Sequence, residues 1–180
     1  MRQNLPMLRF VAPLLLGLAG TLPAQLTPIA PFTGQFSEGF EPGGAGGLGR
    51  VFANTGSIDT VNPAGGLMTF YGWLVYVGYT IYPMGGSNLF AGNLHGHVMI
   101  TFDQPVQRFG GYFGTVGYLA GGHAILRDAN GAILGTPTLL CPRGGWAWDG
   151  WDVGHGHPNI KTIELWGNDP YISGGLTCLE

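Results

Sequence analysis

Apolar and polar positions along this chain follow the pattern of short β-strands. Most apolar stretches alternate with polar residues or are rich in aromatic and β-branched residues, and Gly, Pro or Asn ends each stretch. The expected strands are residues 35–40, 50–53, 67–82, 97–103, 106–115, 123–127, 132–135, 160–166 and 175–179. Residues 67–82 are expected to hold two strands or one long bent strand, so the total is about nine or ten short strands. Strands at this spacing are typical of an all-β sandwich or barrel.

The segment Asp128-Ala-Asn-Gly131 predicts a β-hairpin between residues 123–127 and 132–135. Asn-Gly adopts positive φ at low energetic cost, which a tight hairpin turn requires. Within the long aromatic segment, Gly72 and Gly78 are the candidates for a bulge.

The composition narrows the fold class further. Glycine accounts for 34 of the 180 residues and proline for 13. Each glycine inside a helix costs about 0.5–1 kcal/mol relative to alanine, so a helical bundle or a coiled coil is excluded. The glycines have no three-residue period, which excludes collagen. Hydrophobic residues make up 45% of the chain, enough for a packed core, and disorder is therefore not expected.

Residues 1–24 have the pattern of a secretory signal peptide. Arg2 and Arg9 provide the positive end, an apolar stretch follows at residues 10–20, and cleavage is expected near Ala24. An apolar stretch of about 11 residues is too short to span a bilayer, which takes about 20. We therefore expect a secreted protein (extracellular, at the cell surface or in the periplasm) with no transmembrane segment in the mature chain.

The rest of the chain is expected to form an extended lead-in at residues 25–34 and a single β-sandwich domain at residues 35–180. Loss of Arg2 and Arg9 lowers the number of basic residues from 7 to 5 against 10 acidic residues, so the formal net charge changes from −3 to −5. Phosphate binding needs clustered Lys and Arg, whereas the remaining basic residues are scattered. Nucleic acid is therefore not an expected partner.

The order of motifs in residues 35–180 is similar to that of a known class of exported proteins. The motifs are Phe36-Ser-Glu-Gly-Phe-Glu41, Gly86-Ser-Asn-Leu89, Ile100-Thr-Phe-Asp-Gln-Pro-Val106 with Phe109-Gly110, Leu126-Arg-Asp-Ala-Asn-Gly-Ala-Ile-Leu-Gly135 and Ile160-Lys-Thr-Ile-Glu-Leu165. They resemble secreted bacterial β-sandwich proteins of the PEP-CTERM-associated type, whose jelly-roll core is similar to that of carbohydrate-binding modules. The resemblance implies a jelly-roll-like antiparallel β-sandwich. It does not imply attachment through the sorting tail, because this sequence contains no such tail.

The same resemblance bears on calcium. Such chains often end in a glycine, two or three apolar residues and an Asp-Asp pair, which in related modules shares a structural calcium with an early glutamate. Here the last residues are Gly175-Leu-Thr-Cys-Leu-Glu180, without the pair. Glu38 or Glu41 together with Glu180 is therefore the remaining candidate for a structural calcium site.

A cluster of aromatic residues is the expected ligand-binding site. Trp146, Trp148 and Trp151 lie close together in the sequence, beside Asp149 and Asp152. Indole rings stack on the C–H faces of sugars, and the carboxylates accept hydrogen bonds from sugar hydroxyls, so carbohydrate or a surface polymer is the expected ligand. The alternative is that one or two of these rings pack into the core. The same two interpretations hold for a second aromatic set, Tyr71, Trp73, Tyr76, Tyr79 and Tyr82.

Four histidines form two His-Gly-His units and are candidate metal ligands. The residues are His95, His97, His155 and His157. In a strand, residues i and i+2 point to the same face, so each unit offers two imidazoles to one metal ion. Zn or Cu suits such nitrogen ligands, and Asp149 and Asp152 are candidates to complete the coordination shell. The alternative is that these histidines lie in exposed glycine-rich loops.

The two cysteines, Cys141 and Cys178, are expected to form a disulfide, as an even pair does in an exported chain. The bond would close a loop of about 36 residues and contribute about 3–4 kcal/mol. The alternative is two buried free thiols.

The sequence favours a binding role over catalysis. The close acidic pairs are Asp149 with Asp152 and Glu38 with Glu41, and pairs this close are more typical of turns or metal ligands than of a glycosidase. No Gly-x-Ser-x-Gly motif is present. We therefore expect a secreted, non-enzymatic β-sandwich that binds carbohydrate or another extracellular polymer. The alternatives are a metal-dependent enzyme or metal-binding protein that uses the two His-Gly-His units, and a structural or adhesive surface protein.

Overall fold

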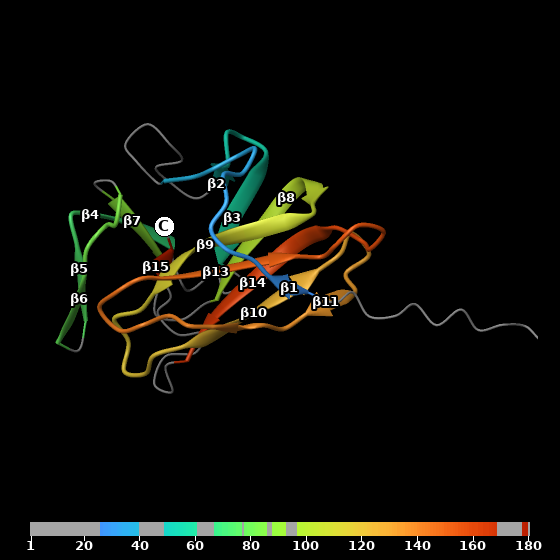
Figure 1. The fold of residues 1–180 in the computed structure, drawn as a ribbon. Helices are drawn as coiled ribbons and strands as arrows, with labels where there is room; N and C mark the ends of the chain where they lie inside the picture. Colours follow the sequence, from blue (N-terminus) through green and yellow to red (C-terminus); the bar gives the residue numbers. More distant parts are fainter. Residues whose placement is uncertain are drawn as a thin grey trace, which may run out of the picture.

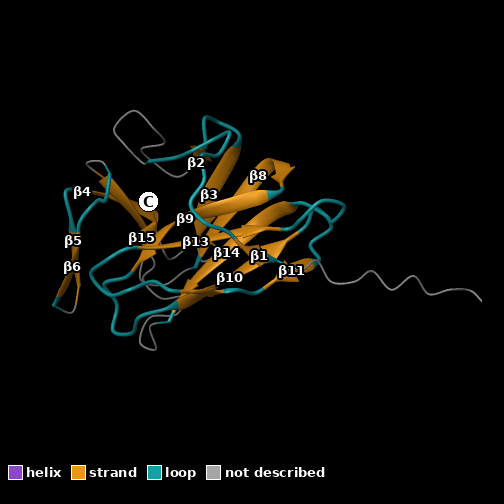
Figure 2. Ribbon diagram, in the orientation of Figure 1, coloured by secondary structure: helices purple, strands orange, loops and turns teal. Residues whose placement is uncertain are grey.

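The structure, a computed structural model, describes residues 26–39, 49–60, 67–76, 78–85, 88–92, 97–168 and 178–179. These residues form strands, turns and loops, as Figure 2 shows, so the expected all-β fold is confirmed. Among them, no helix has the length and the apolar character needed to cross a membrane. The expected signal peptide at residues 1–24 lies outside the described residues.

Six strands form one antiparallel sheet in the order β1-β13-β9-β15-β7-β4. The strands are β1 (Thr27–Pro28), β13 (Ala147–Asp152), β9 (Arg108–Gly114), β15 (Cys178–Leu179), β7 (Asn88–Gly92) and β4 (Leu67–Tyr71). Thr27 and Pro28 pair with Asp152 and Trp151 of β13. The segment that we expected to be an extended lead-in thus adds an edge strand to this sheet.

The second sheet has seven antiparallel strands in the order β11-β10-β14-β8-β3-β2, with β12 also paired to β10. The strands are β11 (Ile133–Gly135), β10 (Gly122–Arg127), β14 (Ile160–Gly167), β8 (Val98–Val106), β3 (Gly56–Thr60), β2 (Gly49–Val51) and β12 (Thr138–Leu139). The expected hairpin between β10 and β11 is present. The carboxylate of Asp128 accepts hydrogen bonds from the amides of Asn130 and Ala132, and Gly131 has a φ of 81°.

The two sheets pack face to face around the main apolar core, which makes the fold a β-sandwich (Figure 1). Ile100 and Ile163 from the seven-stranded sheet and Phe113 from the six-stranded sheet are fully buried in the same cluster. Phe102 and Phe109 meet between the sheets, with ring centroids 5.9 Å apart. Burial of each such side chain contributes about 1.5–3 kcal/mol, so this core is the main source of stability.

A separate two-stranded hairpin lies at one end of the sandwich. It consists of β5 (Leu74–Tyr76) and β6 (Tyr79–Ile81), and Figure 1 shows it beside β4 and β7. Gly72 and Gly78 have φ angles of 84° and 81°, which lie in the left-handed region that favours glycine. The long aromatic segment at residues 67–82 therefore contains three strands, because the chain turns at both glycines.

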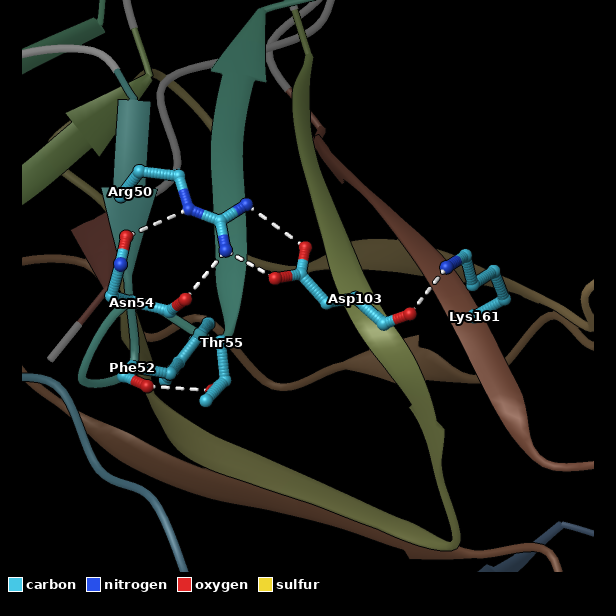
Figure 3. A network of polar contacts seen from close by, with 6 residues as sticks. All are labelled: Arg50, Phe52, Asn54, Thr55, Asp103 and Lys161. Atoms are coloured by element: carbon cyan, nitrogen blue, oxygen red, sulfur yellow. Dashed lines mark hydrogen bonds and ion pairs between the residues drawn. The ribbon is translucent and has the colours of Figure 1, made fainter.

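A strained turn joins β2 to β3. Phe52, Ala53 and Asn54 have φ angles of 54°, 53° and 71°, in a region that residues other than glycine seldom adopt. Arg50 holds this turn against β8, because its guanidinium bonds to Asn54 and to both carboxylate oxygens of Asp103 (Figure 3). Side-chain contacts between neighbouring strands thus stabilise a conformation that the local sequence disfavours.

Two strand predictions differ from the structure. The described residues contain fifteen strands instead of nine or ten, partly because three of them (β1, β12 and β15) have only two residues. Residues 35–39, expected to be a strand, form a bend and a loop. Within that loop, the Glu38 carboxylate accepts a hydrogen bond from the amide of Phe52 at 3.1 Å. This bond ties the loop to the β2–β3 turn.

The expected disulfide is not formed among the described residues, because Cys141 is a free, buried thiol. Cys141 lies in the segment that leads into β13, whereas Cys178 lies on β15 opposite Gly114 of β9. The strand order places β9 between β13 and β15. For Cys141, the alternative of a buried free thiol therefore holds.

Candidate functional site

The β5–β6 hairpin carries a solvent-facing surface with two aromatic rings. Val75 and Thr80 pair with each other across the hairpin. Side chains alternate between the two faces of a strand, so Trp73 and Tyr82, each two residues away, share the face of Val75 and Thr80. Trp73 is 55% exposed and Tyr82 is 63% exposed. We call these four residues the hairpin face.

The hairpin face contains no charged group. Its apolar surface comes from the two rings and from Val75, and its polar groups are neutral: the indole N–H of Trp73 and the hydroxyls of Thr80 and Tyr82. Such a surface suits a ligand that offers apolar C–H faces together with neutral hydrogen-bonding groups.

The opposite face of the hairpin packs against the sandwich. Ile81 and Val116 are fully buried against each other. Leu74, Tyr76 and Trp146 are partly buried around this pair. The hairpin is therefore attached by an apolar cluster of its own, separate from the main core.

Polar contacts fix the hairpin at its second strand. The Nε1 atom of Trp146 donates a hydrogen bond to the carbonyl oxygen of Tyr82 at 2.7 Å. The guanidinium of Arg143 lies 3.6 Å from the centroid of the Tyr79 ring, and its Nε donates to the carbonyl of Gly117 at 3.1 Å. A cation over an aromatic ring is stabilising, so these contacts hold the hairpin face in one orientation.

The tryptophan cluster expected to bind a ligand does not form one exposed surface. Trp151 is only 3% exposed and packs with Phe109 and Phe113 in the main core. Trp146 anchors the hairpin through its hydrogen bond to Tyr82. Of the three tryptophans, Trp151 therefore packs into the core, as the alternative interpretation of the sequence allowed.

Trp148 is enclosed by the N-terminal segment. Its Nε1 donates a hydrogen bond to the carbonyl of Ile29 at 2.8 Å, and its ring stands edge-on to Phe32 with centroids 5.9 Å apart. Beneath it, a Cβ added at Gly110 would lie 2.5 Å from Cζ2 of Trp148. Protein atoms thus already occupy much of the space around this ring.

The two aspartates of the cluster bond within the protein. Asp149 accepts a hydrogen bond from the amide of Leu140 at 2.9 Å, and burial raises the pKa of its carboxyl group. Asp152 accepts hydrogen bonds from the amide of Gly154 and from the side chains of Arg108 and Gln107. These bonds lower the pKa of Asp152, the Gly154 amide most of all.

The two His-Gly-His units lie apart. His97 stacks on Trp166 near one end of β14, with ring centroids 3.7 Å apart, whereas His157 precedes Ile160 at the other end. Six residues of strand separate these ends, which is about 20 Å. Among the described residues, no group of three or more His, Cys, Asp or Glu side chains is arranged to hold a metal ion. His95 lies outside those residues, and His155 is exposed beside His157.

Three stacked rings on the outer face of the seven-stranded sheet were not predicted from the sequence. The Trp166 ring lies between the imidazoles of His97 and His123, at interplanar angles of 17° and 4°. Beside them, the Glu164 carboxylate is 3.0 Å from Nε of Arg127 and 3.6 Å from Nε2 of His97. The three rings lie on two neighbouring strands, β10 and β14, and directly before a third, β8. In the sequence, the alternation within each strand was the only signal that these side chains face outward.

The remaining candidates offer little binding surface. Of the expected calcium ligands, Glu38 bonds to the amide of Phe52, and Glu41 and Glu180 lie outside the described residues. A shallow hollow of about 430 Å³ lies at one end of the seven-stranded sheet. Its lining contains no aromatic ring: Gln104, Pro105, Asp128, Ala129, Asn130, Pro158 and Asn159. The Asp128 carboxylate already bonds within its own turn, so the polar side chains that remain in this hollow are the amides of Gln104, Asn130 and Asn159.

Comparisons of this chain with models of protein families, with curated proteins and with solved structures found no match.

Proposed function

We propose that this protein is a secreted, non-enzymatic β-sandwich that binds carbohydrate or another extracellular polymer through the hairpin face. The observation that carries the proposal is the pair of exposed rings, Trp73 and Tyr82, on a hairpin that is fixed to the sandwich. Exposure of large apolar side chains to water is unfavourable, and grouped exposed apolar side chains mark interaction sites.

The geometry of the hairpin supports binding by ring stacking. Trp73 and Tyr82 lie directly beyond the Leu74–Ile81 pair at the open end of the hairpin, where a continued register would place them opposite each other. Side chains opposite each other in an antiparallel pair have Cβ atoms about 4.5–5.5 Å apart. The two exposed rings therefore offer neighbouring stacking surfaces to the C–H faces of a sugar or of a similar flat apolar unit.

Rigidity adds to the affinity that such a platform provides. Aromatic residues lose little conformational entropy on binding, because they have only two side-chain torsions. The Ile81–Val116 packing and the Trp146–Tyr82 hydrogen bond already order the backbone beneath the rings. A ligand therefore meets a surface that needs little further ordering, which lowers the entropic cost of association.

The chemistry of the hairpin face supports binding rather than bond cleavage. Hydrolysis of a glycosidic bond normally uses two carboxyl groups about 5–9.5 Å apart. The hairpin face has none, and the two aspartates nearest to the tryptophans, Asp149 and Asp152, bond to backbone and side-chain donors of the protein itself. The secretory leader expected at residues 1–24 and the resemblance to secreted bacterial β-sandwich proteins support an extracellular polymer as the ligand.

A polysaccharide pull-down tests the proposal. The purified protein and two variants, Trp73→Ala and Tyr82→Ala, are incubated with a panel of insoluble polysaccharides, and the unbound fraction is measured. We expect the parent protein to bind at least one polymer and each variant to bind it about tenfold more weakly, since 1.4 kcal/mol corresponds to a factor of ten.

The matched control is Ile133→Ala. Ile133 is 54% exposed on β11, which lies on the opposite side of the sandwich from the hairpin (Figure 1). This variant removes exposed apolar surface elsewhere and should bind like the parent. Binding that is unaffected by both hairpin variants, or no binding to any polymer, contradicts the proposal.

A further inference from the structure

The charge of the hairpin and its surroundings defines the class of polymer. We infer that the ligand of the hairpin face is a neutral polysaccharide and not an acidic one. This inference rests on the proposed function, because it takes the hairpin face as the binding surface.

The residues of the hairpin and of the sequence on either side of it carry no charged side chains. Between Asp59 and Asp103 the sequence contains no Asp, Glu, Lys or Arg, and the hairpin lies in the middle of this interval. Acidic polysaccharides are recognised through charge-assisted hydrogen bonds, for which Arg and Lys are the donors. The part of the chain that forms the hairpin face supplies no such donor.

Arg143 is a cation that contacts the hairpin from the side of the sandwich. Its guanidinium lies over the ring of Tyr79, and Tyr79 is on the side of the hairpin that faces the sandwich. Its Nε already donates to the carbonyl of Gly117. Arg143 therefore serves the attachment of the hairpin and is not part of the hairpin face.

The charge of the whole molecule also disfavours an acidic ligand. The chain has 10 acidic and 7 basic residues, which gives a formal net charge of −3 at pH 7. A negatively charged protein repels a polyanion, and no cationic group on the hairpin face opposes that repulsion. For the same reason an anionic membrane is disfavoured, because attachment to anionic lipid uses Lys and Arg side chains near the surface.

The polar groups of the hairpin face suit hydroxyl groups. The hydroxyls of Thr80 and Tyr82 donate and accept hydrogen bonds, and the indole N–H of Trp73 donates one. Neutral sugars offer hydroxyl groups at the rim of an apolar ring face, so stacking on Trp73 and Tyr82 brings these groups near to one another. A purely apolar partner would leave the polar groups without hydrogen bonds, at an energetic cost.

Affinity electrophoresis in gels that contain soluble polysaccharides tests the inference. The neutral probes are hydroxyethylcellulose, galactomannan and a soluble β-glucan, and the acidic probes are alginate and polygalacturonate. We expect at least one neutral polymer to retard the protein equally at about 20 and 500 mM NaCl, because screening of charges does not affect stacking. Trp73→Ala should weaken this retardation about tenfold, and Trp73→Tyr, which keeps a ring, should weaken it less.

The outcomes separate the inference from the proposed function. Trp73-dependent binding to an acidic polymer in preference to every neutral one overturns the inference and leaves the proposed function in place. No Trp73-dependent binding to any polymer overturns both. Trp73-dependent binding to zwitterionic phosphatidylcholine vesicles, or Trp73-dependent dimerisation in analytical ultracentrifugation, in the absence of polymer binding also overturns both. Ile133→Ala is the control in each assay, and circular dichroism establishes that every variant is folded.

Discussion

At the scale of single residues, Trp148 and Gly110 show how closely the sandwich is packed on the outer side of the six-stranded sheet. Gly110 pairs with Gly150 across β9 and β13, and the Trp148 ring lies over both positions. An added Cβ at Gly110 would lie 2.5 Å from Cζ2 of Trp148, closer than side chains approach in real proteins. Glycine is required here because the ring occupies the space that a methyl group would need.

Gly110→Ala should therefore destabilise the protein by about 1–3 kcal/mol, the usual cost of overpacking. Urea unfolding measures the change as a lower midpoint. The control is Gly39→Ala, because an added Cβ at Gly39 meets nothing within 4 Å. Equal midpoints for Gly110→Ala and the control would show that the ring is not packed as described.

Cys141 should be unreactive in the folded protein. Burial, together with a smaller effect of the charge of Asp149, raises the pKa of its thiol to about 12, so almost no reactive thiolate forms near neutral pH. In a Cys178→Ser variant, which leaves Cys141 as the single thiol, a thiol reagent at about pH 8 should react only after unfolding. A reducing agent should leave the melting temperature of the parent protein unchanged. A large decrease on reduction would instead indicate a disulfide.

Protonation of His97 should make the folded protein less stable in mild acid. Burial lowers the pKa of His97 below 6.5; Glu164 opposes this shift and His123 adds to it. A histidine with a lowered folded-state pKa binds fewer protons in the folded chain than in the unfolded chain. Its contribution to the free energy of unfolding is therefore lost as the pH falls below 6.5 toward the folded-state pKa.

Thermal unfolding between about pH 7.5 and 5.5 measures this effect as a falling melting temperature. The fall should be smaller in His97→Gln, which removes the titrating imidazole. His155→Gln is the control, because His155 is exposed in the loop between β13 and β14. If both variants keep the full pH dependence of the parent, His97 is not its source.

At the scale of elements, the β5–β6 hairpin combines an attached face with an exposed face. The attached face depends on the Ile81–Val116 cluster and on the hydrogen bond from Trp146 to Tyr82. The exposed face depends on the orientation that these contacts impose. Loosening the attachment should therefore weaken binding even when the hairpin face itself is unchanged.

Trp146→Phe tests this dependence, because it keeps an aromatic ring but removes the N–H donor to Tyr82. The loss of one hydrogen bond should cost about 0.5–1.5 kcal/mol. Hydrogen exchange of the β5 and β6 amides should become faster, while exchange in β8 and β14 stays the same. Unchanged exchange in the hairpin would show that this hydrogen bond does not hold it.

The limits of sequence-based prediction are visible in the same elements. The odd spacing of Trp148 and Trp151 indicates that they lie on opposite faces of a strand, which separates the expected cluster. The partner that encloses Trp148 is Ile29, 119 positions away, and no local pattern reveals such a contact. Likewise, the His97–Trp166–His123 stack depends on the order of β8, β14 and β10 in the sheet. Rings are readily found in a sequence, but their neighbours are set by the strand order.

At the scale of the whole molecule, the all-β fold follows from local patterns, whereas the arrangement of its strands does not. Alternation at residues 97–103 and 160–166 and the Asn-Gly turn predict β8, β14 and the β10–β11 hairpin, because a half-buried strand and a tight turn have local signatures. The strand expected at residues 35–40 is not formed at residues 35–39, where the Glu38 carboxylate accepts a hydrogen bond from the amide of Phe52 within a loop instead. The positive φ angles of Gly72 and Gly78 turn the chain twice, so part of the long aromatic segment forms a hairpin outside the two sheets.

The indole N–H signals of the protein provide the most direct measurement of the central claim. The chain has five tryptophans, and each gives one such signal in a two-dimensional NMR spectrum. On titration with a neutral oligosaccharide from the polymer that the protein binds, the Trp73 signal should shift, while those of Trp148 and Trp151 stay in place. Shifts at Trp148 or Trp166 with no change at Trp73 would contradict the account, because binding would then occur away from the hairpin face.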